Sequence, residues 1–340
     1  MNLSLFFTAD HSIFHVYKQD DEWMINEHAY RYTFYSLAMD RQTNRLYVGT
    51  FDHGLFYSDD YGKTLHPVGI GITSNRIISL AISDQRGDVD SSYQTIWAGT
   101  EPSQIFRSDD GGSTWQTFSS LQHIPSKNTW SFPPRPYTHH VRTIQPDIHD
   151  SKRIFVGIEL GGVMRSLDNG QTWEDRKEHS QHDCHSLTMH PTEKNRIYEA
   201  AGGGFAESSD GGKTWETKND GLDPYTYLVS VAVDSSDPET IIASAAKNAR
   251  TAYVPERAHT VIMRRKNGEG WKILSNNLPV PDGSSAFLLA SDTERDKTFY
   301  AVNNTGLYET ENGGDHWKKI PVEWPSFLRQ MRMRAFILSH

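Results

Sequence analysis

The sequence predicts an all-β fold, a seven-bladed β-propeller, in which seven similar sheets stand around a central channel. Two observations carry this prediction. A short motif recurs seven times at intervals of roughly 40 to 60 residues, which is the spacing of propeller blades. Between the motifs, short apolar strand patterns such as YSLAMD and RLYVGT alternate with turn residues such as DRQTN, and no stretch shows sustained helical periodicity. We therefore expect one domain spanning all 340 residues.

The recurring motif is Ser-x-Asp-x-Gly-x-Thr followed by Trp or Leu. Four segments match it, namely SDDYGKTL (58–65), SDDGGSTW (108–115), SLDNGQTW (166–173) and SSDGGKTW (208–215). Three weaker copies end at Trp317, Trp271 and Trp23. Asp side chains bond nearby backbone N–H groups in tight turns, and Gly adopts positive φ there. We interpret these aspartates as builders of the fold, with the Trp packed between neighbouring sheets.

The motif spacing divides the chain into seven units. They cover residues 1–29 with 333–339, 33–68, 76–120, 139–178, 184–218, 226–275 and 285–321. The first unit begins directly with LSLFFTA and lacks an inner strand, whereas the chain ends with a spare apolar segment, Met333–Ser339. We expect this segment to close the ring as the inner strand of the first blade, because closure removes exposed sheet edges.

The four good copies of the motif resemble the Asp-box, or BNR repeat, of sialidase-type β-propellers, and the repeat covers nearly the whole chain. In that family the box joins the third and fourth strands of a blade, away from the axis. The resemblance brings in sialidases, xyloglucan-type glycosidases, uncharacterised bacterial BNR-repeat proteins labelled glycosyl hydrolases, and non-catalytic photosystem assembly factors. The chain departs from sialidases because it lacks a recognisable arginine triad of their kind and has seven units rather than six.

Composition narrows the classes of partner. A net charge of −9 argues against binding to nucleic acid or an anionic membrane, and no apolar run is long enough to span a bilayer. The N-terminal MNLSLFFTADHSIF has no basic region, so we interpret it as a strand rather than a signal peptide. A single cysteine excludes an intrachain disulfide and suits a reducing compartment. We expect a cytoplasmic protein.

Histidines gather in the segment Glu178–Pro191, which also holds the only cysteine. Aligning the units on HVRTIQP and HSLTMHP gives His140 and His185 the same place in neighbouring blades, where the inner strand begins beside the channel. Strand alternation directs Asp183 and His185 one way, and His182 and Cys184 the other. Cys184 is expected to be an ordinary buried thiol. His190, beside Pro191, is expected in a turn.

Carboxylates and an arginine interrupt the apolar pattern in the same units. Glu101 and Glu159 take one repeat position at the end of the second strand, while Glu199 and Arg142 stand where other units have apolar residues. Such breaks in a repeat often mark function. Two structural alternatives stay open: Glu199 and Arg142 form a buried ion pair, or the two histidines fill the channel with hydrogen-bonded rings.

The segment Ser119–His140 is unusually long for a link between blades and is rich in Pro and aromatic residues. Long structured loops commonly act as lids or binding loops. We expect Trp130, Phe132, Arg135 and Tyr137 to roof the channel mouth; the alternative is that the loop only plugs the channel.

Three functional classes follow from these residues. The first is an enzyme, a hydrolase or lyase acting on a carbohydrate or small anionic substrate, with Glu159, Glu101, His185, Asp183 and Arg142 as catalytic candidates. Arg135, Trp130, Tyr137 and Glu199 are the ligand-binding candidates, and His140 with His185 would hold one divalent metal ion if the site uses one. The second class is a non-catalytic assembly propeller with a protein partner. The third is a small-ligand binding protein.

Overall fold

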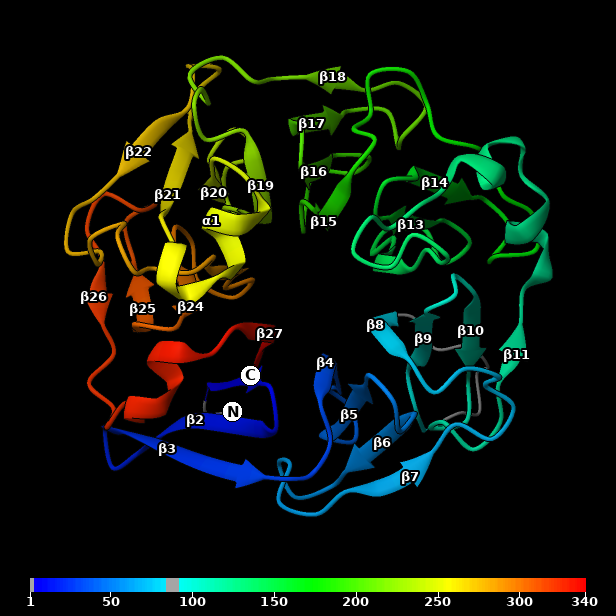
Figure 1. Cartoon of the computed structure of the whole chain (residues 1–340), viewed down its shortest axis with the longest axis horizontal. Helices are drawn as coiled ribbons and strands as arrows, with labels where there is room; N and C mark the ends of the chain where they lie inside the picture. The colour runs from blue at the N-terminus through cyan, green and yellow to red at the C-terminus, as the bar shows by residue number, and fades with distance from the viewer. Residues whose placement is uncertain (1–2, 84–91) are drawn as a thin grey trace.

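The computed structural model describes residues 3–83 and 92–340. Within them, seven antiparallel sheets stand in a ring, as Figure 1 shows. The fold is therefore the predicted seven-bladed β-propeller. Parts of two expected units, residues 1–2 of the first and 84–91 of the third, lie outside the described residues. Among the described residues, no helix is long and apolar enough to cross a membrane.

The first three blades each have four strands, ordered from the channel outward. Blade 1 contains β27 (Met333–Ser339), β1 (Ser4–Ala9), β2 (Ser12–Gln19) and β3 (Glu22–Ala29). Blade 2 contains β4 (Phe34–Asp40), β5 (Arg45–Thr50), β6 (Leu55–Ser58) and β7 (His66–Val68). Blade 3 contains β8 (Ile77–Ser83), β9 (Thr95–Thr100), β10 (Ile105–Ser108) and β11 (Gln116–Thr117).

The remaining four blades follow the same order. Blade 4 contains β12 (Val141–Pro146), β13 (Ile154–Ile158) and β14 (Gly162–Ser166). Blade 5 contains β15 (Cys184–Met189), β16 (Ile197–Ala201), β17 (Gly204–Ser208) and β18 (Glu216–Thr217). Blade 6 contains β19 (Tyr227–Val233), β20 (Ile241–Ala246), β21 (Thr260–Arg265) and β22 (Lys272–Leu274). Blade 7 contains β23 (Leu288–Ser291), β24 (Phe299–Asn303), β25 (Gly306–Thr310) and β26 (Lys318–Lys319).

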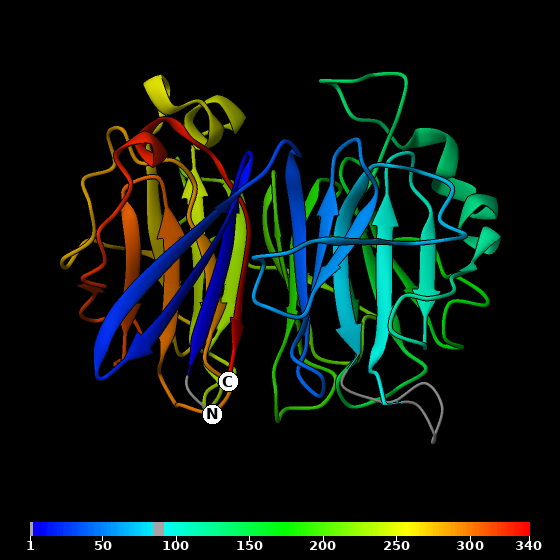
Figure 2. The ribbon, with the colours of Figure 1, turned by 90° about the horizontal axis from the view of Figure 1, so that it is seen from below.

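Short helices decorate the ring. They are α1 (Ala249–Tyr253) and the 3-10 turns η1 (Ser119–His123), η2 (Pro125–Thr129), η3 (Pro255–Arg257) and η4 (Ser326–Gln330). Figure 2 shows α1 and η4 at the face opposite the N and C labels. We call the face that carries α1 the top face.

The Ser-x-Asp-x-Gly-x-Thr motif forms the turn between a third and a fourth strand. In blade 3, Ser108 Oγ donates to Asp110 Oδ1 at 2.8 Å, and Thr114 donates its backbone N–H and its hydroxyl to the two Asp110 oxygens at 2.9 and 2.6 Å. Gly112 has φ of 90° and donates its N–H to Ser108 Oγ at 2.9 Å. Equivalent bonds recur at Asp60, Asp168 and Asp210. These aspartates are structural, as the sequence predicts.

The Trp or Leu that closes a motif packs between blades, and Leu65 does so between blades 1 and 2. Trp317 is fully buried in a cluster that joins Ile242 and Ile262 of blade 6 to Phe299 of blade 7. Trp115 packs into the cluster of Tyr47 from blade 2 and residues of blade 3. Burial of such large apolar surfaces stabilises each blade-to-blade contact.

The ring closes through β27, which pairs antiparallel with β1 from Ser4↔Ser339 to Ala9↔Met333. This confirms the predicted role of the segment Met333–Ser339. Met333 is buried in one core cluster with Leu5 and Phe7, so the closing strand also completes the packing of blade 1.

Deletion of residues 333–340 would expose one edge of β1 and open the ring. We expect a loss comparable with the roughly 5–15 kcal/mol that stabilises a typical domain, seen as the disappearance of a cooperative thermal transition. The control is a permuted chain in which residues 333–340 precede residue 1 through a short Gly/Ser linker. Because Ser339 lies beside Ser4, this chain retains blade 1 and should unfold like the wild type. A deletion variant with a wild-type transition would contradict the prediction.

Candidate functional site

The inner strands surround a central cavity of about 380 Å³. Its wall has one repeated irregularity. In six inner strands the pairing with the second strand skips one residue near the top, which leaves a one-residue β-bulge. The bulged residues are Arg334, Tyr35, Ile78, Arg142, His185 and Val229, and all six line the cavity. Bulges often redirect a side chain, and here they direct one side chain per blade into the channel.

The bulges correct the alignment of the histidines. Val141 pairs with Ile158 and Cys184 with Ala201, so Arg142 in blade 4 is the equivalent of His185 in blade 5. His140 stands two residues earlier and is the equivalent of Asp183. The expectation that His140 and His185 share one repeat position was wrong by two residues, because Pro146 ends β12 whereas Pro191 lies two residues beyond the end of β15.

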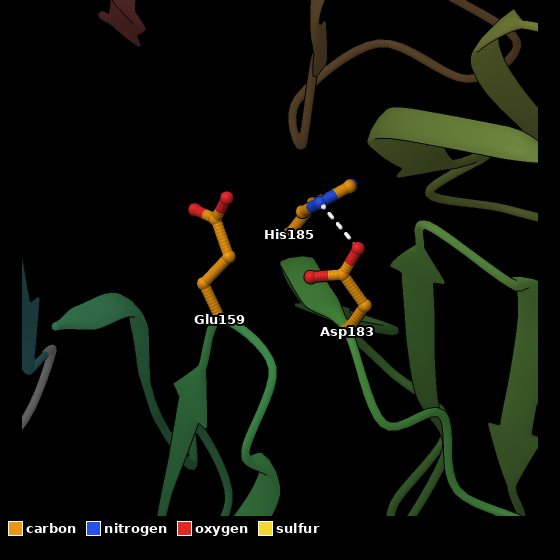
Figure 3. A group of neighbouring side chains, drawn as sticks. All are labelled: Glu159, Asp183 and His185. Carbon is orange, nitrogen blue, oxygen red and sulfur yellow. Dashed lines mark ion pairs between the residues drawn. The ribbon is translucent and has the colours of Figure 1, made fainter. Parts of the chain in front are cut away.

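Glu159, Asp183 and His185 come together at the top of the channel between blades 4 and 5, as Figure 3 shows. One carboxylate oxygen of each acid and one ring nitrogen of His185 all lie within 4.8 Å of one another. His185 Nε2 is 3.4 Å from Asp183 Oδ2. Asp183 Oδ1 accepts a hydrogen bond from the backbone N–H of Leu160 at 3.2 Å, which fixes its orientation.

The backbone orients the ring of His185. Its Nδ1 lies 2.6 Å from the carbonyl oxygen of Leu228, which can only accept, so Nδ1 carries the proton. His185 Nε2 is buried and has no hydrogen-bond partner among the described residues. In the neutral ring its lone pair therefore points toward the two carboxylates, an arrangement that is repulsive unless a proton or a metal cation lies between them.

Glu159 is held as a carboxylate by its neighbours. Its Oε2 is 2.9 Å from His140 Nε2 and 3.7 Å from Arg142 Nε. Burial alone would raise the pKa of Glu159, but the hydrogen bond from His140 and the charge of Arg142 outweigh it and hold the pKa at about 2. The carboxylate is therefore charged across the physiological pH range.

Glu101 anchors the long loop rather than facing the cavity. It is fully buried, and Arg135 binds it with both prongs of its guanidinium, Nε to Oε1 at 2.7 Å and Nη2 to Oε2 at 2.5 Å. Arg76 adds a bond to Oε1 at 2.9 Å. Burial would raise the pKa of Glu101, but Arg135, His140 and Arg76 together lower it. His140 Nδ1 lies 3.6 Å from Glu101, so His140 connects this anchor to Glu159.

The other loop residues occupy different surroundings. Trp130 is buried in the core cluster of blades 3 and 4, beside Val141 and Ile158. Phe132 lies against the ring of His140, with 4.7 Å between centroids. Tyr137 is 80% exposed. Of the four aromatic and basic residues expected over the channel mouth, Phe132 and Arg135 thus contact the Glu101–His140 group, and Trp130 anchors the loop from below.

Glu199 lies apart from the cavity. It is fully buried next to Cys184 and accepts the backbone N–H of Gln181 at 2.9 Å. Burial, the dominant cause, raises the pKa of Glu199 to about 8. The alternative of an ion pair between Glu199 and Arg142 is not found in the described structure, where Arg142 pairs with Glu159 instead. Glu199 also does not line the cavity as a ligand-binding residue would. Burial also raises the pKa of the Cys184 thiol, in keeping with an ordinary buried cysteine.

The remaining histidines of the segment are peripheral. His182 is exposed. His190 is buried in a turn, where its Nδ1 accepts the backbone N–H groups of Thr192 and Glu193 at 3.2 and 2.9 Å.

Two arginines at the channel mouth were missed in the sequence, Arg332 and Arg334, which stand on either side of the first residue of β27. By the bulge register, Arg334 is the equivalent of Arg142, and Asp10, directly after β1, is the equivalent of Glu159. The pair repeats the geometry as well, because Arg334 Nη2 lies 3.4 Å from Asp10 Oδ1. Extending the repeat alignment to the closing strand would have found them.

Comparison with family models and with curated proteins finds no match. Solved structures share the fold. An ancestral GH74 enzyme aligns with a TM-score of 0.63 at 15% identity, covering 84% of this chain and 38% of its own. YCF48 from Cyanidioschyzon merolae aligns with a TM-score of 0.55 at 13% identity, covering 85% and 84%. The extracellular domain of the two-component system BT3049 from B. thetaiotaomicron aligns at 0.57 and 12%, covering 92% and 38%. At these identities the likeness establishes the propeller alone.

The buried carboxyl of Glu199 should make stability depend on pH. The folded chain keeps its proton up to about pH 8, whereas an unfolded glutamate loses it near 4.5. The folded state therefore binds more protons in that window, and the free energy of unfolding should fall as pH rises from 4.5 to 8. The shift corresponds to a loss on the order of 5 kcal/mol.

Glu199→Gln removes the titration and should flatten this slope, measured by urea unfolding at pH 5 and pH 8. Glu193→Gln, at an exposed position of the same blade, is the control and should keep the wild-type slope. Equal slopes in the wild type and Glu199→Gln would refute the assignment.

Proposed function

We propose that the top of the channel is the active site of a metal-assisted hydrolase or lyase acting on a carbohydrate or small anionic substrate. The observation that carries the proposal is the convergence of Glu159, Asp183 and His185. Three ligand atoms from two adjacent blades face one point, and the backbone contact at Leu228 leaves the free nitrogen of His185 aimed at it.

The donor set suits a divalent transition metal. One imidazole and two carboxylates are ligands that Zn²⁺ and Mn²⁺ accept, and three protein ligands leave positions open for water or substrate, as in catalytic sites. Glu159 supplies its charge without competition from protons because its pKa is about 2. His140 belongs to the supporting contacts rather than the ligand set, since its Nε2 bonds Glu159 and orients it.

The chemistry follows from these surroundings. Glu159, Asp183 and His185 would hold the cation, which would supply Lewis acidity for the activation of water or of a carbonyl or phosphoryl group. Phe132 packs on His140 and helps to seal the supporting contacts from solvent. Arg142, beside Glu159, is placed to hold a negative group of the substrate near the reacting centre.

A glycosidase mechanism that uses Glu101 and Glu159 as an acid–base pair has less support. Such a pair needs one carboxyl with a raised pKa to donate the proton. Burial is outweighed at both residues, and the pKa of each is lowered by arginine and histidine neighbours. The pair therefore offers two bases and no acid, and Arg135 and Arg76 occupy the oxygens of Glu101.

We also infer that the repeated turns are Asp-boxes, supported by the hydrogen bonds that recur at Asp60, Asp110, Asp168 and Asp210.

A binding role is the competing functional class. YCF48 has been solved bound to a D1 peptide, and another protein of the same fold has been solved in a nidogen/laminin complex. Some large exposed apolar side chains of the described residues, such as Ile70 and Val280, lie in loops, whereas Met24 and Ile273 lie in strands β3 and β22. A cytoplasmic location stays a prediction.

The test measures binding of Mn²⁺ and Zn²⁺ to the purified chain by calorimetry, with metal content confirmed by mass spectrometry. We expect about one ion per chain and a 10- to 100-fold weaker affinity in His185→Gln and Asp183→Asn, the range for loss of a ligand or its support. His182→Gln makes the same chemical change at an exposed site three residues away and should bind like the wild type.

Equal affinity in His182→Gln and His185→Gln, or no binding to the wild type, would sink the metal proposal. That outcome would favour a propeller that binds a partner or small ligand without turnover.

A further inference from the structure

Arg332 is a half-buried cation that has no counter-ion among the described residues. Its guanidinium carbon lies 3.5 Å from the centre of the Tyr253 ring. Its Nε is buried and unpartnered, and the described residues offer its side chain neither an ion pair nor a hydrogen bond. An uncompensated charge in a partly buried place costs free energy. Arginines that stack on aromatic rings also serve in the recognition of carboxylate and phosphate groups.

Arg142 and Arg334 are almost as poorly matched. Each has one distant carboxylate, Glu159 at 3.7 Å and Asp10 at 3.4 Å, and the Nε of each is buried without a partner among the described residues. By contrast, Arg135 forms a close bidentate ion pair with Glu101 in the same chain. The two channel arginines keep donor groups free.

The charges of Arg142 and Arg334 both act on Arg332. Arg142 and Arg334 occupy equivalent bulges and line the same cavity. Burial lowers the pKa of Arg332, and the like charges of Arg334 and Arg142 lower it further. Tyr35 supports Arg334, which stacks on the Tyr35 ring at 4.7 Å and donates to its hydroxyl at 3.1 Å.

We propose that Arg142, Arg332 and Arg334 form an anion-binding subsite, which takes a carboxylate or phosphate group of the ligand, with Tyr35 and Tyr253 supporting the guanidinium planes. This rests on, and deepens, the proposed function: the substrate is an anion whose charged group lies on the arginines while its reacting part reaches His185 across the same cavity. Guanidinium forks match the planar oxygens of carboxylate and phosphate. The subsite draws its residues from blades 1 and 4.

The experiment titrates metal-free protein, prepared with EDTA, with inorganic phosphate and separately with malonate, and measures affinity by calorimetry. We expect at least one of these anions to bind the wild type, and Arg332→Gln and Arg142→Gln to weaken binding by about tenfold or more, as for a lost hydrogen bond to a charged group. Arg329→Gln, an exposed arginine of η4, is the matched control and should leave affinity unchanged.

Arg332→Lys guards against misfolding, because it retains a charge over Tyr253 but loses the fork; it should bind with intermediate affinity. The proposal is overturned if neither anion binds the wild type, or if Arg332→Gln, folded by circular dichroism, binds as tightly as Arg329→Gln. Because no metal is present, failure here leaves the Glu159–Asp183–His185 proposal standing, and failure of metal binding leaves this one standing.

Discussion

Closure of the ring is the constraint on which the rest of the molecule depends. A propeller blade buries its faces only against the next blade, so an open ring leaves an apolar face and a strand edge in water. The chain meets this requirement by pairing β27 with β1. The inner strands then stand at fixed distances around one cavity, and every candidate functional group at the channel mouth takes its position from that arrangement.

The one-residue bulge allows the structural ring to carry functional side chains in its channel. In six of the seven inner strands the bulge directs an additional side chain toward the axis. The bulge position is equivalent in each of these blades, but its residue type differs. Ile78 and Val229 make parts of the cavity wall apolar. Arg142, His185 and Arg334 make other parts polar. The residue after the second strand varies in the same way, which places Glu159 and Asp10 beside the two arginines.

The sequence was sufficient for the fold because the Ser-x-Asp-x-Gly-x-Thr turns are local: each is built from residues within one short segment, and its hydrogen bonds need no information from elsewhere. The same repeat located Glu159, Asp183 and His185 correctly in neighbouring blades. The repeat gave the wrong position for His140, because a bulge shifts the pairing register of a strand without changing the residue types in it. It also missed Arg332 and Arg334, since the repeat alignment stopped before the closing strand. The engagement of Glu101 by Arg135 depends on the path of a long loop.

Two of the three channel arginines arrive on the closing strand or directly before it, and the third belongs to a blade on the far side of the cavity. An anion bound between these arginines would connect the closing strand β27 to a blade on the opposite side of the channel. Such a ligand would stabilise the pairing of β27 with β1, because separation of these strands would also require loss of the bound anion. Ligand binding in the channel and closure of the ring would then be thermodynamically linked.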